Sequence, residues 1–316
     1  MLTYLLAILA AAANAASSVL QRKANRKVPQ KQNLSLRLIW SLLHEPAWFG
    51  GVAAVIAGFL LQAAALSNGE LSVVEPMLVL ELPLTLVLAS VVFGARLRSR
   101  EWGSALAMTA ALAGLLYFLS PSAGRPGGVA WYLWLAGIGL NLAVVGGLVA
   151  WGRRGPAGSG AVAGSSAHQA AVLGIAAGSG FGLTAALMKG MTQSLSQGLA
   201  ALFTSWQLYA MIAAGALSMF LVQSAMNAGR LLAAQPGLTL SDPLVSILWG
   251  VLVFSERVRG GWFLVLAVVS GLVMAGAVIV LARSPLLSGD SAREEEAQQR
   301  GGRKPAAGTS PGPDSR

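Results

Sequence analysis

Two acidic residues lie in the middle of apolar stretches, where a charge is costly. Glu81 is twelve residues before Phe93, and Asp242 is twelve residues before Phe254. A charged side chain at the centre of a membrane-spanning helix costs about 2.5–3.5 kcal/mol on insertion scales, so such residues tend to be functional. Either carboxyl group could take up and release a proton, or hold a cation. Each could instead serve structure alone, as a buried acid hydrogen-bonded to a neighbouring helix.

Prolines accompany these acids in the same stretches. Glu75 directly precedes Pro76, and the residue before a proline is biased away from the helical conformation. Pro76, Pro83, Pro236 and Pro243 each leave a helix carbonyl without its usual N–H donor. These four prolines are therefore candidate helix breaks. A broken helix lines a substrate cavity with free carbonyls and carboxylates in some transporters, although a simple packing kink is the alternative for each.

Two glutamines and a lysine are further polar residues within the apolar stretches. Gln62 and Gln223 could bind substrate, or they could form hydrogen bonds between helices, which are worth about 0.6 kcal/mol on average. Lys189 is expected to end a span and to extend its ammonium group to the membrane interface. The candidates for binding a substrate or coupling ion are thus Glu75, Glu81, Asp242, Gln62 and Gln223.

Several classes of chemistry are unsupported by the sequence. The chain has no Cys and only two His, so we expect no thiolate nucleophile and no zinc or other metal site. It also lacks the G-x-x-x-x-G-K-[ST] phosphate loop, so we expect no ATP-driven pump within this chain. We therefore predict a protein that is not an enzyme and that needs no cofactor.

The composition is that of a membrane protein. Of 316 residues, 55% are hydrophobic and 11% are charged, against roughly 25% charged in soluble domains. Uncharged runs of about 20 residues predict membrane-spanning helices, and their continuous apolar character favours helices over a barrel. We predict an all-α membrane protein with about nine spans. They cover residues 2–20, 47–67, 71–94, 102–120, 129–151, 170–190, 199–227, 231–254 and 261–282.

Two of these assignments leave alternatives open. The stretch 199–227 is long for one crossing, so a tilted or broken helix is expected there. A tenth span around Leu34–Leu43 is the alternative to nine, although this stretch is short and contains Arg37.

The basic residues predict the orientation. With the N-terminus outside, and with Lys189 and the distal tail left out of the count, the inner loops carry thirteen Lys and Arg and the outer loops carry three, namely Arg125, Arg257 and Arg259. This bias favours an outside N-terminus and a cytoplasmic C-terminus in a multi-pass protein of the plasma membrane. The net charge of +10 reflects this bias and a basic tail, so no nucleic-acid partner is expected.

The chain contains an internal repeat with an offset of 160 or 161 residues. Phe59 and Gln62 match Phe220 and Gln223, Glu75-Pro76 matches Gln235-Pro236, and Pro83 matches Pro243. Phe93 and Trp102 match Phe254 and Trp262. Glu81 and Asp242 are equivalent in this frame. The repeat predicts a first transmembrane unit at 1–120, a connecting helix and loop at 121–169, a second unit at 170–283, and a disordered polar tail at 284–316. Paired spans are five apart in order, so the two units should have inverted topology, as in many secondary transporters.

The chain resembles the drug/metabolite transporter superfamily, whose halves are EamA-like. The resemblance rests on a Pro-containing span from Pro243 to Phe254-Ser-Glu256-Arg257, followed by a Gly-rich span from Gly260 to Gly276. The first half has Ala95 at the equivalent acidic position, a departure from the pattern. The nine spans, with Trp206 to Gln223, Asn227 and then Pro236, are also similar to the NIPA-type magnesium transporters.

The resemblance covers about residues 1–283 and implies a secondary transporter with an inverted-repeat bundle. Such a protein moves a small solute by alternating access, with proton coupling as a further step. The first alternative is a NIPA-like magnesium or divalent cation transporter, in which Glu75, Glu81 and Asp242 supply hard oxygen ligands. The second is a non-transporting membrane scaffold. The expected partners are a small-molecule or ion substrate and the lipid bilayer.

Overall fold

The computed structural model describes residues 1–25, 46–94, 97–122, 124, 129–154, 162–228 and 231–282, and these residues are almost entirely helical. The tenth span around Leu34–Leu43, Ala95 and the tail at 284–316 lie outside the described residues. The helices are α1 (Leu2–Asn25), α3 (Pro46–Asn68), α4 (Leu71–Leu78), α5 (Glu81–Phe93), α6 (Ser99–Leu119), α7 (Trp131–Arg154), α8 (Val162–Leu195), α9 (Leu199–Thr204), α10 (Trp206–Ala228), α11 (Leu231–Leu252) and α12 (Trp262–Ala282).

Eight segments in the described part of the chain are long and apolar enough to cross a membrane: α1, α3, α4 with α5, α6, α7, α8, α10 and α12. The chain is therefore a multi-pass, all-helical membrane protein, as its composition predicts. The ninth expected span corresponds to α11, which has 22 residues but is not among the eight. Gln235, Asp242 and two prolines lower its apolar character, so the count of nine spans stays a prediction.

Helix breaks occur at two of the expected places. The third span is divided at Val79 and Leu80 into α4, with Pro76 inside it, and α5, with Pro83 in its first turn. The stretch 199–227 is divided at Ser205 into α9 and α10.

No break occurs in α11, which the sequence led us to expect to be interrupted. It runs as one helix through Pro236 and Pro243. A proline removes only one N–H donor from a helix, and neighbouring helices and local adjustments can compensate for it in a membrane bundle.

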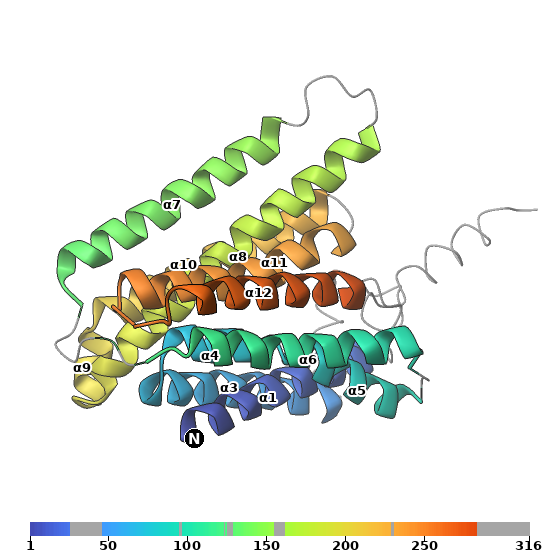
Figure 1. The fold of residues 1–316 in the computed structure, drawn as a ribbon, viewed down its shortest axis with the longest axis horizontal. Helices are drawn as coiled ribbons and strands as arrows, with labels where there is room; N and C mark the ends of the chain where they lie inside the picture. The colour runs from blue at the N-terminus through green and yellow to red at the C-terminus, as the bar shows by residue number, and fades with distance from the viewer. Residues whose placement is uncertain are drawn as a thin grey trace, which may run out of the picture.

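The helices form two groups that meet along their length (Figure 1). In one group α1 packs against α3, α4 and α5, and in the other α8 packs against α10 and α11. The groups are joined where α4 contacts α11 and where α6 contacts α12. Helix α7 lies at the edge of the molecule and packs mainly on α8 (Figure 1).

Helices α8 and α11 approach each other closely because α8 presents glycines. A Cβ atom added at Gly178 would lie 2.9 Å from the Ser241 Cβ, and one added at Gly182 would lie 2.8 Å from the Val245 Cβ. Small residues let helix backbones come together in a membrane. This contact fixes the position of α11, and therefore of Asp242, against α8.

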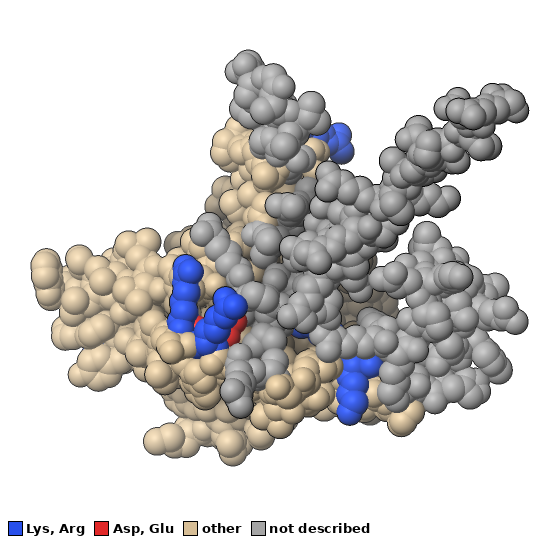
Figure 2. Space-filling model, turned by 90° about the vertical axis from the view of Figure 1, so that its right-hand side faces the viewer, with Lys and Arg blue, Asp and Glu red and all other residues tan. Residues whose placement is uncertain are grey.

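The outer surface of the bundle is largely uncharged. On α12, for example, Val268 is 56% exposed and Leu272 is 67% exposed. Figure 2 shows one end of the molecule, where the described charged residues form a few separate patches among uncharged residues. Side chains of this kind suit a lipid environment.

Candidate functional site

A cavity of about 490 Å³ lies between the two groups of helices, lined by residues of α1, α3, α4, α5, α8 and α11. Four of the five predicted candidates line it: Gln62, Glu75, Glu81 and Asp242. Residues separated by up to 180 positions in the chain are therefore brought to one site. We call this the central cavity.

The break between α4 and α5 places two carboxyl groups at the central cavity. Glu75 is in the second turn of α4 and is only 3% exposed. Gln62 of α3 donates a hydrogen bond from its Nε2 to Glu75 Oε1 at 2.8 Å. Glu81 begins α5, and Ser18 of α1 donates from its Oγ to Glu81 Oε1 at 3.3 Å.

The third carboxyl group comes from the opposite group of helices. Asp242 lies in α11, and its Oδ1 is buried without a hydrogen-bond partner in the described part of the structure. The carboxyl groups of Asp242 and Glu75 are close enough to interact electrostatically. The Asp242 carboxyl group interacts with Ser246, but its Oδ1 has no hydrogen-bond partner among the described residues. A buried polar atom without a partner is energetically unfavourable, so this part of the cavity is suited to a group that the protein itself does not provide.

The remaining lining combines apolar walls with amides and the hydroxyl groups of Thr184 and Thr239. Phe59, Phe181 and Met188 contribute apolar surface, and Asn14 and Gln235 contribute amides. None of the described lining residues is Lys or Arg. The sequence reasoning did not single out Asn14, although a polar residue in the middle of the first apolar run was a visible signal.

Gln223 does not join the central cavity. It is exposed on α10, whereas its repeat equivalent Gln62 faces Glu75. Only a small part of α10 is buried in the bundle, so the matched position of Gln223 in sequence does not give it a matched environment. Of the four prolines, Pro243 lines the cavity. Pro76, Pro83 and Pro243 are buried, and Pro236 is partly buried.

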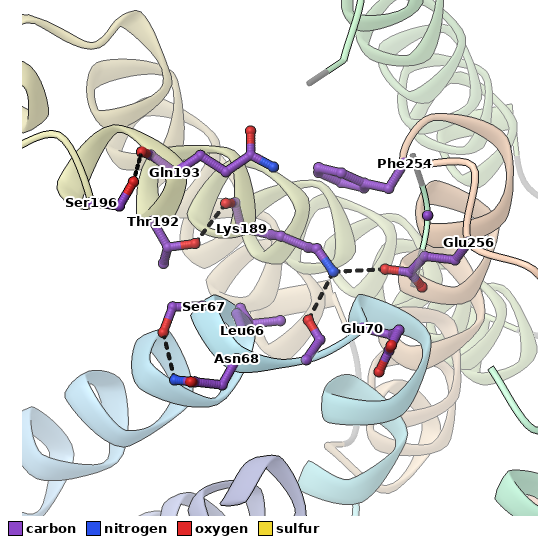
Figure 3. A pocket seen from close by; sticks show the side chains of 12 residues that line it. Leu66, Ser67, Asn68, Glu70, Lys189, Thr192, Gln193, Ser196, Phe254 and Glu256 are labelled. Carbon is purple, nitrogen blue, oxygen red and sulfur yellow. Dashed lines mark hydrogen bonds and ion pairs between the residues drawn. The ribbon is translucent and has the colours of Figure 1, made fainter. Parts of the chain in front are cut away.

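A second polar region lies at the end of the bundle that holds the α3–α4 connection (Figure 3). Lys189 of α8 forms an ion pair with Glu256, with 2.8 Å between Nζ and Oε1, and donates a second hydrogen bond to the Gly69 carbonyl at 2.9 Å. The Lys189 ammonium also lies 5.3 Å from the centre of the Phe254 ring. Glu256, Lys189 and the start of α4 together form what we call the Lys189–Glu256 cluster.

Glu256 caps a helix of the other half of the molecule. It accepts hydrogen bonds from the backbone N–H groups of Leu71 at 2.7 Å and Ser72 at 3.0 Å, and from the Ser72 hydroxyl. These N–H groups open α4, whose own preceding residue, Glu70, provides no side-chain cap. A carboxylate at this position satisfies orphan donors and interacts favourably with the helix dipole.

The expectation that Lys189 reaches the membrane interface is wrong. The Lys189 side chain is 13% exposed and the Glu256 side chain is 1% exposed, and the two are in direct contact. Helix α8 continues to Leu195, six residues beyond Lys189. The partner, Glu256, follows α11 in the chain, and no local pattern around Lys189 indicates this pairing.

The backbone after α11 positions the Glu256 side chain at the start of α4. Ser255 adopts a positive φ of 55°, and the Glu256 N–H returns to the Gly250 carbonyl at 2.8 Å. A Cβ atom at Gly250 would lie 2.7 Å from the Ser72 Oγ and closer still to Glu256. Only glycine therefore leaves room for the carboxylate to reach α4.

A separate cavity of about 390 Å³ adjoins the Lys189–Glu256 cluster, lined also by Asn68, Ser196 and Phe254 (Figure 3). It shares no described lining residue with the central cavity. The ion pair and its bonds to α4 thus adjoin one cavity, and Glu75, Glu81 and Asp242 line another.

Comparison with known proteins gives one informative relative. An uncharacterised protein of Corynebacterium glutamicum is 29% identical over 295 residues, which cover 92% of this chain and 99% of the relative. No family model and no solved structure matches the chain. The relative shares nearly its whole length with this chain, and its description names no activity.

Proposed function

We propose that the protein is a secondary transporter of the drug/metabolite type, which moves a small solute across the membrane by alternating access. Proton coupling through Glu81 or Asp242 is part of the proposal. The observation that carries it is the central cavity, in which carboxyl groups from both groups of helices meet beside a broken helix. Cavities between halves, lined by discontinuous helices, are the binding sites of many secondary transporters.

The helix contacts support the inverted repeat on which this proposal depends. Contacts of α1 with α3 and with α4 and α5 have counterparts in the contacts of α8 with α10 and α11. The contacts of α6 with α12 and of α4 with α11 join equivalent spans to each other. This is the pattern expected for two units related by a pseudo-two-fold axis.

The Lys189–Glu256 cluster provides the closure at one end of the bundle. Glu256 from the second half holds the first turn of α4, and α4 carries Glu75 into the central cavity. Separation of the halves at this end requires these bonds to break. In our proposal the cluster forms in the state closed at this end and opens when the two halves rock apart.

The proposed test measures flux into proteoliposomes under an imposed pH gradient, with a fluorescent report of internal pH and a panel of metabolites that includes magnesium. Wild type is compared with Glu81→Gln. Solute-dependent proton movement that is lost in Glu81→Gln supports the coupled transporter. Unchanged coupled flux in this variant removes Glu81 from the coupling role, and the absence of flux for every solute contradicts transport.

We also propose that the protein lies in the plasma membrane, with its N-terminus outside the cell and its C-terminus in the cytoplasm. In this orientation the Lys189–Glu256 cluster closes the outer side. The chain has no Cys, so single replacements such as Gly260→Cys and Arg153→Cys report the side directly. An impermeant maleimide added to intact cells should label the first and spare the second.

A divalent-cation transporter remains the alternative to be separated by the magnesium arm of the panel. No group of three or more His, Cys, Asp or Glu side chains within the described ranges comes together in a metal-binding arrangement, so no specific observation favours it. A non-transporting scaffold would tolerate apolar replacements of Glu75, Glu81 and Asp242 without loss of function.

A further inference from the structure

The charge and the walls of the central cavity indicate the class of solute that it binds. Glu75, Glu81 and Asp242 contribute three carboxyl groups, and no Lys or Arg stands among the described lining residues. Each buried carboxylate must be paired or neutralised, because an isolated charge is strongly disfavoured away from water. A positively charged solute can supply that pairing, whereas an anionic solute would add to the imbalance.

The hydrogen bonds already made in the cavity point to where such a solute would bind. Glu75 and Glu81 each accept one side-chain hydrogen bond, from Gln62 and Ser18 respectively. Asp242 differs, since its Oδ1 is buried and has no partner in the described structure. Asp242 is also close enough to Glu75 for their charges to interact. A cation between these two carboxyl groups would pair with one carboxylate from each half of the molecule.

The walls favour an organic cation over a bare metal ion. The cavity of about 490 Å³ is within the range of pockets for small organic ligands, about 300–1,000 Å³. Phe59, Phe181 and Met188 border it, and apolar and aromatic walls of this kind hold the apolar body of an organic ligand. A metal ion needs several oxygen ligands at once, and the described residues form no such group of three or more acidic or His side chains.

We propose that the central cavity binds a singly charged organic ammonium compound, with the ammonium between Asp242 and Glu75 and the apolar body against Phe59 and Phe181. This inference rests on the proposed function, because it names the substrate class of the same site. In the transport cycle the cation and a proton would compete for the same carboxyl groups.

The first experiment compares ligands of equal shape and different charge on the purified full-length protein in detergent. Binding of phenethylammonium and benzyltrimethylammonium is measured by calorimetry beside neutral 2-phenylethanol and anionic phenylacetate. The cations should bind at least about tenfold more tightly than the neutral and anionic compounds. Equal binding of 2-phenylethanol, tighter binding of phenylacetate, or binding of magnesium but of neither ammonium compound would overturn the inference.

The second experiment locates the site with variants. Asp242→Asn keeps the shape of the side chain and should weaken ammonium binding at least about tenfold, whereas Gln223→Ala, on the exposed face of α10, should leave it unchanged. Gel filtration and the melting temperature show that both variants fold. Unchanged ammonium binding in Asp242→Asn would overturn the placement of the cation.

The metabolite flux panel separates this inference from the proposed function. Flux of a neutral or anionic solute that is lost in Asp242→Asn, together with no ammonium binding, keeps the transporter and overturns the cationic substrate class. Absence of flux for every solute overturns the transporter itself. Flux of the ammonium compounds in wild type, lost in Asp242→Asn, supports both.

Discussion

The Lys189–Glu256 cluster and the central cavity both contain buried carboxyl groups, but they use them in opposite ways. At the Lys189–Glu256 cluster, the Glu256 carboxylate pairs with the Lys189 ammonium and accepts hydrogen bonds from two backbone N–H groups and a hydroxyl. In the central cavity, the carboxyl groups of Glu75 and Glu81 accept one side-chain bond each, and Asp242 Oδ1 accepts none in the described structure. A satisfied cluster holds one conformation in place, and an unsatisfied one is available to a ligand.

The largest expected effect comes from breaking the satisfied cluster. Lys189→Met should destabilise the closed conformation by about 3–5 kcal/mol, because it leaves the Glu256 carboxylate buried without its cation. The melting temperature of the purified protein and its resistance to denaturant should both fall. The double variant Lys189→Met, Glu256→Gln should lose less than the sum of the two single variants, since the charges are coupled. Additive losses would contradict the pairing.

Removal of a carboxyl group from the central cavity should give the reverse pattern. Asp242→Asn should reduce solute flux at least about tenfold, equivalent to about 1.4 kcal/mol, while stability changes by less than about 1 kcal/mol. The physical reason is that Asp242 has few native bonds to lose. Flux in proteoliposomes and the melting temperature are measured on the same preparation. A strongly destabilised Asp242→Asn protein with normal flux would make this residue structural.

A smaller effect distinguishes the two matched glutamines. Gln62→Ala should lower flux several-fold and cost about 0.6 kcal/mol of stability, the average for a hydrogen bond between membrane helices, because Gln62 donates to Glu75. Gln223→Ala should change neither quantity, because Gln223 is exposed on α10. Equal effects on flux would mean that the repeat places both amides at the substrate path.

The sequence predicted most of the fold and much of the central cavity. Apolar runs fixed the spans because lipid leaves few alternatives to a helix. Glu81 and Asp242 stood out because a charge in such a run is costly, and both line the central cavity. Asn14 was missed only because a single amide in an apolar run is a weak signal.

The Lys189–Glu256 cluster could not be predicted in the same way. Its two charges are 67 residues apart, with Lys189 in α8 and Glu256 in the loop between α11 and α12, and the bonds of Glu256 to α4 involve backbone N–H groups that carry no sequence signal. Gln223 shows that a repeat in the sequence does not by itself predict the surroundings of a side chain. Its place in the repeat is equivalent to that of Gln62, but the environment of a side chain depends on which neighbours its helix meets.

The accessibility of a single cysteine in the central cavity tests alternating access most directly. Thr184 lines the cavity from α8, and the chain has no other Cys, so Thr184→Cys reports this site alone. An impermeant maleimide is added to each side of sealed proteoliposomes, with and without Lys189→Met. Alternating access predicts that loss of Lys189 increases labelling from the side that carries Ser196 and decreases it from the other side. Labelling that is confined to one side, and unchanged by Lys189→Met, would contradict alternating access.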